Sequence, residues 1–149
     1  MVSIKDPLAF QVFNEIGIIN QLTNAAFAAV LPKGMTIAQF TVLNHFIRLE
    51  LDAQSPAKLA RAFQITRPTM TSTLARMAKA GLVVIRADPE DGRGKLVSVT
   101  ESGRKMRDIC LNQLAGPLAE ANALLSPEIM GELLPLLQDV RAKLDSQRD

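Results

Sequence analysis

Apolar residues recur at helical spacing along most of the chain, and two long apolar helices are predicted near its ends. The first covers about residues 7–30 and the second about residues 127–145. Both carry apolar side chains on more than one face, which indicates that each packs against more than one neighbour. Asp6 and Ser126 each precede a proline, so their side-chain oxygens are expected to cap these helices.

The helix predicted to follow the N-terminal one in the chain opens with a capping box. Thr36 and Gln39 have the spacing at which each side chain bonds the backbone N–H of the other residue. We expect this helix to run to about Leu51. Its apolar residues recur at steps of three and four and form one predicted stripe, which consists of Ile37, Phe40, Leu43 and Ile47.

Residues 55–107 hold a different pattern. Ser55 followed by proline starts a short helix, a tight turn follows, and a second helix is predicted over about 68–80. Two short segments rich in β-branched residues come next, 82–86 and 95–99, and a polar loop with two glycines joins them. This order indicates a helix–turn–helix followed by a β-hairpin wing.

Prolines shape the helices that follow the hairpin. Thr100 is expected to cap a helix that carries Glu101 in its first turn. Gly116-Pro117 should kink or end that helix, and Pro135 should bend the last one, because proline removes a helical hydrogen bond.

The helix over 68–80 has two distinct faces. At 100° per residue, Met70, Leu74 and Met77 lie together and define the buried face. The opposite face consists of Pro68, Ser72, Ala75, Arg76 and Lys79, flanked by Thr69 and Thr71. Small residues allow close approach, and hydroxyl and cationic groups bond base edges or phosphates, so this face suits the major groove of DNA. The alternative is an ordinary amphipathic helix with a solvated face.

Positive charge is concentrated in the same segment. Residues 55–107 contain eleven Lys and Arg against four Asp and Glu, a net charge of +7, whereas the rest of the chain carries −5. Such asymmetry is typical of a protein that meets phosphates locally. The predicted loop adds Asp91-Gly92-Arg93, which places an arginine at a hairpin tip, where it can enter a narrow minor groove.

These segments carry a family resemblance. The stretches MTIAQFTVL, SPAKLARAFQITRPTMTSTLARMAKAGLV, RADPEDGRGKLVSVTESG and LSPE occur in this order over about residues 36–145. In them the chain resembles the MarR (multiple antibiotic resistance regulator) family of winged helix–turn–helix regulators. The resemblance implies an obligate dimer on pseudo-palindromic DNA, with Arg93 as the minor-groove arginine, Asp91 as the acid that braces it, and 67–76 as the base-reading helix. It also implies a repressor released by a small aromatic or phenolic ligand, although some members sense oxidants through cysteine or bind zinc.

The sequence therefore predicts a mainly α fold with a small β-hairpin wing, a winged helix–turn–helix whose terminal helices form a dimer interface. Residues 1–34 are expected to be an N-terminal dimerisation helix, 35–107 the DNA-binding region and 108–149 the C-terminal dimerisation helices, all in one structural domain. The predicted function is a cytoplasmic, ligand-responsive repressor that binds a pseudo-palindromic operator as a homodimer. Two alternatives stay open, a protein-interaction module of the same fold that does not bind DNA, and a redox-responsive regulator that acts through Cys110.

The candidate site residues fall into four groups. Those of the recognition helix are Arg67, Pro68, Thr69, Thr71, Ser72, Arg76 and Lys79. Those of the wing are Arg93 and Lys95, with Asp91 as the orienting residue, and those expected at the DNA backbone are Ser55 and Lys58. His45 and Arg48 are the candidate anchors for an anionic ligand. The absence of Trp and Tyr leaves the six Phe as the only aromatic rings besides His45 for such a pocket.

Other functions find little support in the sequence. His45 and Cys110 lie 65 positions apart without a zinc-ligand spacing, so we predict no metal and no cofactor, and we expect Cys110 to be a small buried residue. No nucleophile elbow or phosphate-binding glycine loop is present, so no catalytic residue is predicted. The first ten residues do not resemble a secretory signal, and no apolar run is long enough to span a membrane.

Overall fold

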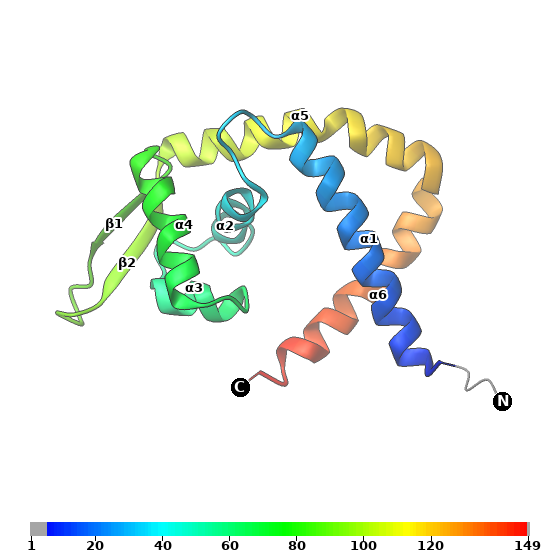
Figure 1. Ribbon diagram of the computed structural model, residues 1–149, viewed down its shortest axis with the longest axis horizontal. Helices are drawn as coiled ribbons and strands as arrows, with labels where there is room; N and C mark the ends of the chain where they lie inside the picture. The colour runs from blue at the N-terminus through cyan, green and yellow to red at the C-terminus, as the bar shows by residue number, and fades with distance from the viewer. Residues whose placement is uncertain (1–5, 149) are drawn as a thin grey trace. The chain divides into compact units, whose positions relative to one another are not determined.

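The structure, a computed structural model, describes residues 6–148, so the first five residues of the predicted 1–34 segment and the last residue of 108–149 lie outside the described part. The chain divides into two compact units, Met1–Gln113 and Leu114–Asp149. The elements in chain order are α1 (Leu8–Val30), α2 (Ile37–Arg48), α3 (Pro56–Ala62), α4 (Arg67–Lys79), β1 (Val83–Ala87), β2 (Lys95–Val99), α5 (Glu101–Leu125) and α6 (Pro127–Asp145) (Figure 1).

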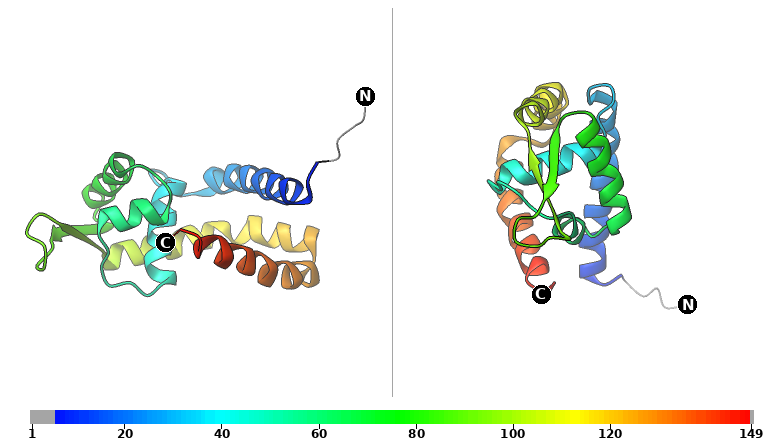
Figure 2. Two further views of the ribbon diagram at one scale, coloured as in Figure 1. Left: turned by 90° about the horizontal axis from the view of Figure 1, so that it is seen from below. Right: turned by 90° about the vertical axis from the view of Figure 1, so that its left-hand side faces the viewer.

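The predicted fold class is confirmed, since the chain is mainly helical and carries one antiparallel hairpin. Strands β1 and β2 pair in a register that places Val83 opposite Val99 and Ala87 opposite Lys95. Gln54 adds a single bridge to β2, with two backbone hydrogen bonds of 3.0 and 2.9 Å to Val97. Figure 2 shows the hairpin projecting beyond α3 and α4.

One apolar core holds the helix–turn–helix and the hairpin together. The side chains of α4 and the strands meet those of α2 and α3, so the core draws on every element from α2 to β2. Its buried members are Val42, Leu43, Phe46, Leu59, Ala60, Met70, Leu74, Met77, Leu82, Val83 and Val97. Burial of α2 differs from the predicted stripe, because Val42 and Phe46 are buried while Ile37, Phe40 and Ile47 are only partly covered.

Most predicted helix starts are confirmed by side-chain hydrogen bonds. Thr36 and Gln39 form the capping box, with both bonds at 3.2 Å. Ser55 Oγ accepts from Lys58 N–H at 3.2 Å, and Ser126 Oγ accepts from Ile129 N–H at 3.4 Å. The expectation for the first helix is wrong, because α1 starts from Pro7 and has no side-chain cap within the described residues, so Asp6 lies one residue too early.

Two helices of the first unit end at non-glycine residues in the left-handed region. Glu50 has a φ of 53° after α2, and Leu51 N–H then bonds Phe46 C=O at 2.9 Å. Gln64 has a φ of 54° after α3, and Ile65 N–H bonds Ala60 C=O at 3.0 Å. This pattern closes the last turn of each helix. The helix predicted to about Leu51 therefore ends at Arg48.

The helix after the hairpin, α5, was predicted either to kink or to end at Gly116-Pro117. Thr100 Oγ1 accepts from Gly103 N–H at 3.0 Å, which confirms the predicted cap. The helix α5 then runs through Gly116-Pro117 to Leu125, so the expectation that it ends there is wrong. Pro117 removes only one backbone N–H donor. The remaining backbone hydrogen bonds are sufficient for α5 to continue past it.

The two terminal helices are apolar and exposed, each in its own unit. In Leu8–Val30 and Pro127–Asp145, which the structure describes in full, no residue is buried. Leu22 on α1 is 68% exposed, and Leu134 on α6 is 57% exposed. Among residues 6–148 no helix combines the length and the apolarity that crossing a membrane requires.

Candidate nucleic-acid interface

The α4 helix has the two faces that its sequence predicts. Met70, Leu74 and Met77 are at most 1% exposed and anchor α4 to the core. Thr66 caps the helix, since its Oγ1 accepts from Thr69 N–H at 3.3 Å, and Pro68 stands in the first turn, where a missing N–H costs nothing. The anchored face thereby fixes which side chains point away from the core.

The opposite face of α4 is exposed over its whole length. All of its predicted residues are exposed, namely Arg67, Pro68, Thr69, Thr71, Ser72, Ala75, Arg76 and Lys79. The Thr69 hydroxyl lies 2.8 Å from that of Thr66, so the cap engages it. Thr71 and Ser72 have small side chains on the open part of the face, which allows a close approach to base edges.

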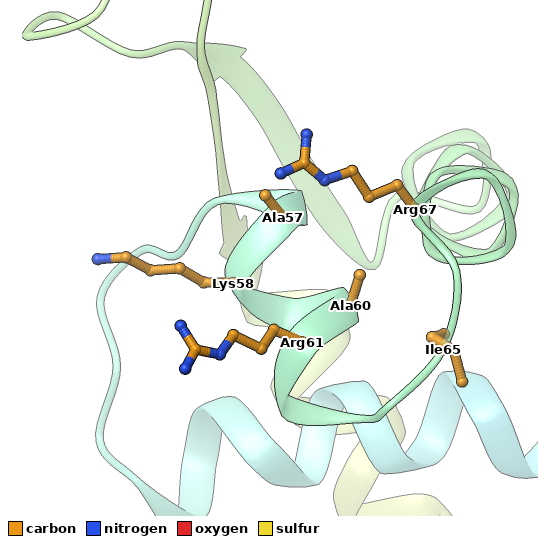
Figure 3. A pocket seen from close by; sticks show the side chains of 6 residues that line it. All are labelled: Ala57, Lys58, Ala60, Arg61, Ile65 and Arg67. Carbon is orange, nitrogen blue, oxygen red and sulfur yellow. The ribbon is translucent and has the colours of Figure 1, made fainter. Parts of the chain in front are cut away.

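A shallow hollow lies where α3 meets the turn and the start of α4. Its volume is about 400 Å³, and it is lined by Ala57, Lys58, Ala60, Arg61, Ile65 and Arg67. Figure 3 shows Arg67 reaching from α4 toward Ala57, while Lys58 and Arg61 extend from α3 on the other side. Three cations around a small apolar floor form a surface suited to a phosphate group.

The hollow unites predicted residues with one that the sequence analysis missed. Lys58 and Arg67 were predicted as DNA contacts, but Arg61 was not. The signal was available, since Arg61 follows Lys58 by three residues on a predicted helix and must share its face. Ser55 stands at the start of the same helix, where its oxygen caps α3 while its hydroxyl hydrogen stays available for a further bond.

The hairpin tip is a compact turn held by aspartates. Asp88 N–H donates to Gly94 C=O at 3.0 Å, and Asp88 Oδ1 accepts from Glu90 N–H at 2.9 Å. Asp91 Oδ1 accepts from the backbone N–H of Arg93 at 3.1 Å. Asp91 therefore fixes the backbone that presents Arg93, and within residues 6–148 no ion pair joins its carboxylate to the Arg93 guanidinium.

The cations of α4 and of the wing are available to an external anionic partner. Within the described residues, the ion pairs observed on α5 and α6 and after α6 involve none of Arg67, Arg76, Lys79, Arg93 and Lys95. Together, these exposed cations give α4 and the wing a positive field. Such a field attracts a polyanion and speeds its association.

The two candidate ligand anchors, His45 and Arg48, are placed differently. His45 Nε2 donates to Gln54 Oε1 at 3.1 Å, and its ring packs edge-on against Phe63 with 5.0 Å between centroids. His45 thus connects α2 to the bridge that Gln54 makes with β2. Arg48 is exposed at the end of α2, and the hollow described above includes neither residue.

Cys110 is placed where its thiol has little reactivity. Cys110 on α5 is fully buried, and burial raises the pKa of its thiol by more than a backbone hydrogen bond lowers it. The nearby Arg107 guanidinium bonds Asn44 Oδ1 at 3.1 Å and Asp108 at 3.4 Å. In the described part of the chain, no three His, Cys, Asp or Glu side chains gather as a metal site would require.

Known proteins share this arrangement. The family model described as MarR family matches residues 33–94, from just before α2 into the hairpin tip. The transcriptional activatory protein BadR of Rhodopseudomonas palustris is 32% identical over 91 residues, which cover 60% of this chain and 52% of BadR. Over the helix–turn–helix and the hairpin, the chain is therefore similar to proteins of the MarR family. The match to BadR spans about half of that relative's length.

Solved structures of transcriptional regulators have the same fold. A MarR mutant from E. coli complexed with operator DNA has a TM-score of 0.71 and 25% identity, covering 91% of this chain and 99% of that one. The transcriptional regulator BldR from Sulfolobus solfataricus also has a TM-score of 0.71 and 25% identity, covering 91% of this chain and 95% of that one. The likeness includes the terminal helices, which the matched family model does not reach.

Proposed function

We propose that this protein is a sequence-specific DNA-binding transcriptional regulator of the MarR family. The observation that carries the proposal is the exposed α4 face, with Arg67, Arg76 and Lys79 unpaired, beside a wing that presents Arg93. The operator-bound E. coli MarR structure supports it, because that relative presents the same fold to DNA. In this proposal α4 enters the major groove and Arg93 the adjacent minor groove.

The residues divide by what they contact in the proposed complex. Thr71, Ser72 and Arg76 read base edges from α4, and Arg67 and Lys79 lie at its two ends. Ser55, Lys58 and Arg61 bind phosphate around the hollow on α3. Such contacts position the protein on the duplex without reading its sequence.

Selection of bound fragments from a random-sequence DNA pool tests the function directly. The proposal requires a common motif with two related half-sites, and the selected duplex must outcompete an unrelated one. Recovery of no motif, with no shift of labelled duplex at low salt, would contradict DNA binding. The same result would favour the alternative of a protein-interaction module with this fold.

Arg76→Ala and Arg93→Ala are expected to weaken binding in different ways. Arg76→Ala should cost about 1–3 kcal/mol per half-site and relax base preference, because a guanidinium bonds base edges. Arg93→Ala should lower affinity most on sites with A·T-rich flanks, where a narrow minor groove focuses negative potential. Titrations of both variants against the selected duplex, with the flanks varied, measure the two effects.

Arg141→Ala is the matched control for these variants. It removes the same charge from α6, where Arg141 pairs with Asp145 at 3.3 Å. An exposed pair of this kind contributes about 0–1 kcal/mol to stability, so the fold should be unaffected. Wild-type affinity in both Arg76→Ala and Arg93→Ala, or an equal loss in Arg141→Ala, would overturn the placement of the interface.

The regulator is proposed to act as a homodimer on a pseudo-palindromic operator. The exposed apolar residues on α1 and on α6 support this, since isolated regulators rarely expose so much apolar surface. Two recognition helices would then meet half-sites about 34–36 Å apart, one turn of the duplex. A footprint over a single half-site would argue against this arrangement.

The sign and control of regulation are finer parts of the proposal. We propose a cytoplasmic repressor released by a small aromatic or phenolic ligand, on the strength of the family resemblance, although BadR is by its name an activator. Arg48 is free to meet an anionic group, whereas His45 is engaged with Gln54. A reporter placed downstream of the selected operator distinguishes repression from activation.

The redox alternative is less well supported. A cysteine that senses oxidants needs an accessible thiolate. Cys110 is fully buried and burial raises the pKa of its thiol, so little thiolate is present at neutral pH. DNA binding that responds to peroxide in the wild type but not in Cys110→Ser would restore this alternative.

A further inference from the structure

The backbone that follows the recognition helix α4 is hydrogen-bonded to the start of α5. Gly81 follows α4 with a φ of 74°, Leu82 N–H bonds Met77 C=O at 2.9 Å, and Gly81 N–H bonds Ala78 C=O at 3.0 Å. This closure satisfies carbonyls of the last turn of α4 and leaves the carbonyl of Gly81 for another partner.

That partner is the hydroxyl of Thr100. Thr100 Oγ1 donates to Gly81 C=O at 2.6 Å, and the same oxygen accepts from Gly103 N–H at 3.0 Å. One hydroxyl therefore caps the start of α5 and ties it to the end of α4. The Thr100 N–H adds a bond to Leu82 C=O at 3.1 Å, so two consecutive carbonyls after α4 are held by one residue.

Gly103 shows how closely the two segments approach. A Cβ atom built on Gly103 would clash with Leu82 O and lie 2.8 Å from Val99 Cγ1, so any larger residue would force the backbone apart. Gly103 is also buried. The first turn of α5 thus packs directly on the backbone that leaves the recognition helix.

We propose that Thr100 is a positioning residue for DNA recognition, whose hydroxyl fixes the orientation of α4 relative to α5. This inference rests on the proposed function, that of a dimeric DNA-binding protein. The helix α5 begins at Glu101, directly after its cap Thr100, so the Thr100 hydroxyl joins the first turn of α5 to the segment that follows α4.

The expected consequence concerns half-site spacing. A dimer binds an operator when the distance between its two recognition helices matches the distance between the two half-sites of the DNA. We call the hydrogen bond from Thr100 Oγ1 to Gly81 C=O the tether. Because it holds α4 in one orientation before DNA binds, less conformational entropy is lost on binding, and duplexes with a different half-site spacing bind more weakly. Loss of this hydrogen bond is expected to lower the affinity for a duplex with the correct half-site spacing. It should also reduce the difference in affinity between that duplex and duplexes with other spacings.

Substitutions at Thr100 separate the cap from the tether. Thr100→Asp keeps an acceptor for Gly103 N–H, and aspartate is as good a cap as threonine. A carboxylate has no hydrogen to donate, so it repels the Gly81 carbonyl and breaks the tether. Thr100→Ser keeps both bonds, whereas Thr100→Val loses both. Thr41→Val is a matched control, since it removes an exposed hydroxyl that bonds only Ile37 C=O within α2.

The experiment compares two duplexes for each full-length variant. One is the duplex selected by the wild-type protein, and the other has one base pair inserted between its half-sites. The ratio of the two affinities measures spacing discrimination. We expect the wild type, Thr100→Ser and Thr41→Val to share one ratio, and Thr100→Asp to reduce it by about 3- to 10-fold for each protomer, the equivalent of one hydrogen bond in each.

The readouts distinguish three outcomes. A Thr100→Asp protein that melts at a lower temperature but keeps the wild-type ratio would show a purely structural role and overturn the inference. Should Thr100→Asp fail to fold by circular dichroism, Thr100→Val carries the same comparison with the same expected loss. A wild-type protein that selects no duplex would instead remove the proposed function on which the inference depends.

Discussion

Raising the salt concentration from about 50 to about 200 mM is expected to lower the affinity for operator DNA by about 10³–10⁵. The reason is the concentration of eleven Lys and Arg within residues 55–107, where the net charge is +7. Each cation that neutralises a phosphate releases counterions, and about 6–10 such contacts per dimer are expected. Lys58, Arg61 and Arg67 surround the hollow in which one of these phosphates would lie.

A titration of affinity against salt checks this prediction. The slope of log affinity against log salt should lie near −0.9 for each phosphate contact. Lys58→Ala should reduce the magnitude of the slope by about 1 for each protomer without changing base preference. Lys143→Ala, which removes a cation paired with Asp139 on α6, should leave the slope unchanged. A wild-type slope near zero would remove DNA as the partner.

The sequence predicted those features of the fold that depend on neighbouring residues. Helix caps at Thr36, Ser55 and Ser126 are local hydrogen bonds within three residues, and all of them are confirmed. The buried face of α4 was also predictable, because Met70 and Leu74 follow the period of a helix. Local chemistry decides such features, so the distant chain has little influence on them.

Helix ends were harder to predict because the usual signal was missing. Glu50 and Gln64 adopt the left-handed conformation that glycine normally supplies, and neither residue type indicates a helix end. The core around Phe46 and Leu59 holds these turns in place, so the ends are set by tertiary packing. After α4, by contrast, the left-handed position is occupied by a glycine, Gly81.

Contacts between distant residues were the main part of the site that the sequence did not reveal. The bond of His45 to Gln54 and the bridge of Gln54 to Val97 join segments that no periodicity connects. The tether from Thr100 to Gly81 spans nineteen positions. Each requires the folded hairpin, so only the structure places these groups together.

Leu22→Glu and Leu134→Glu are expected to disrupt the proposed homodimer, and with it DNA binding. Leu22 lies on α1 with 68% of its surface exposed, and Leu134 lies on α6 with 57% exposed. In a monomer, a charge at either position would change stability by no more than about 0.5 kcal/mol. In a symmetric dimer each substitution occurs twice at the interface, so the loss of two buried leucines costs about 3–6 kcal/mol.

Such a loss corresponds to an increase of about 10²–10⁴ in the dimer dissociation constant. Sedimentation of the wild type and both variants at several concentrations measures it, and the melting temperature should fall as well, because dimers of this kind often have no stable monomer. Val84→Glu is the matched control, since Val84 is 51% exposed but lies on β1 in the wing. A wild-type protein that sediments as a folded monomer at micromolar concentration would contradict the dimer. If Leu22→Glu and Leu134→Glu sediment like Val84→Glu, the exposed faces of α1 and α6 have another role.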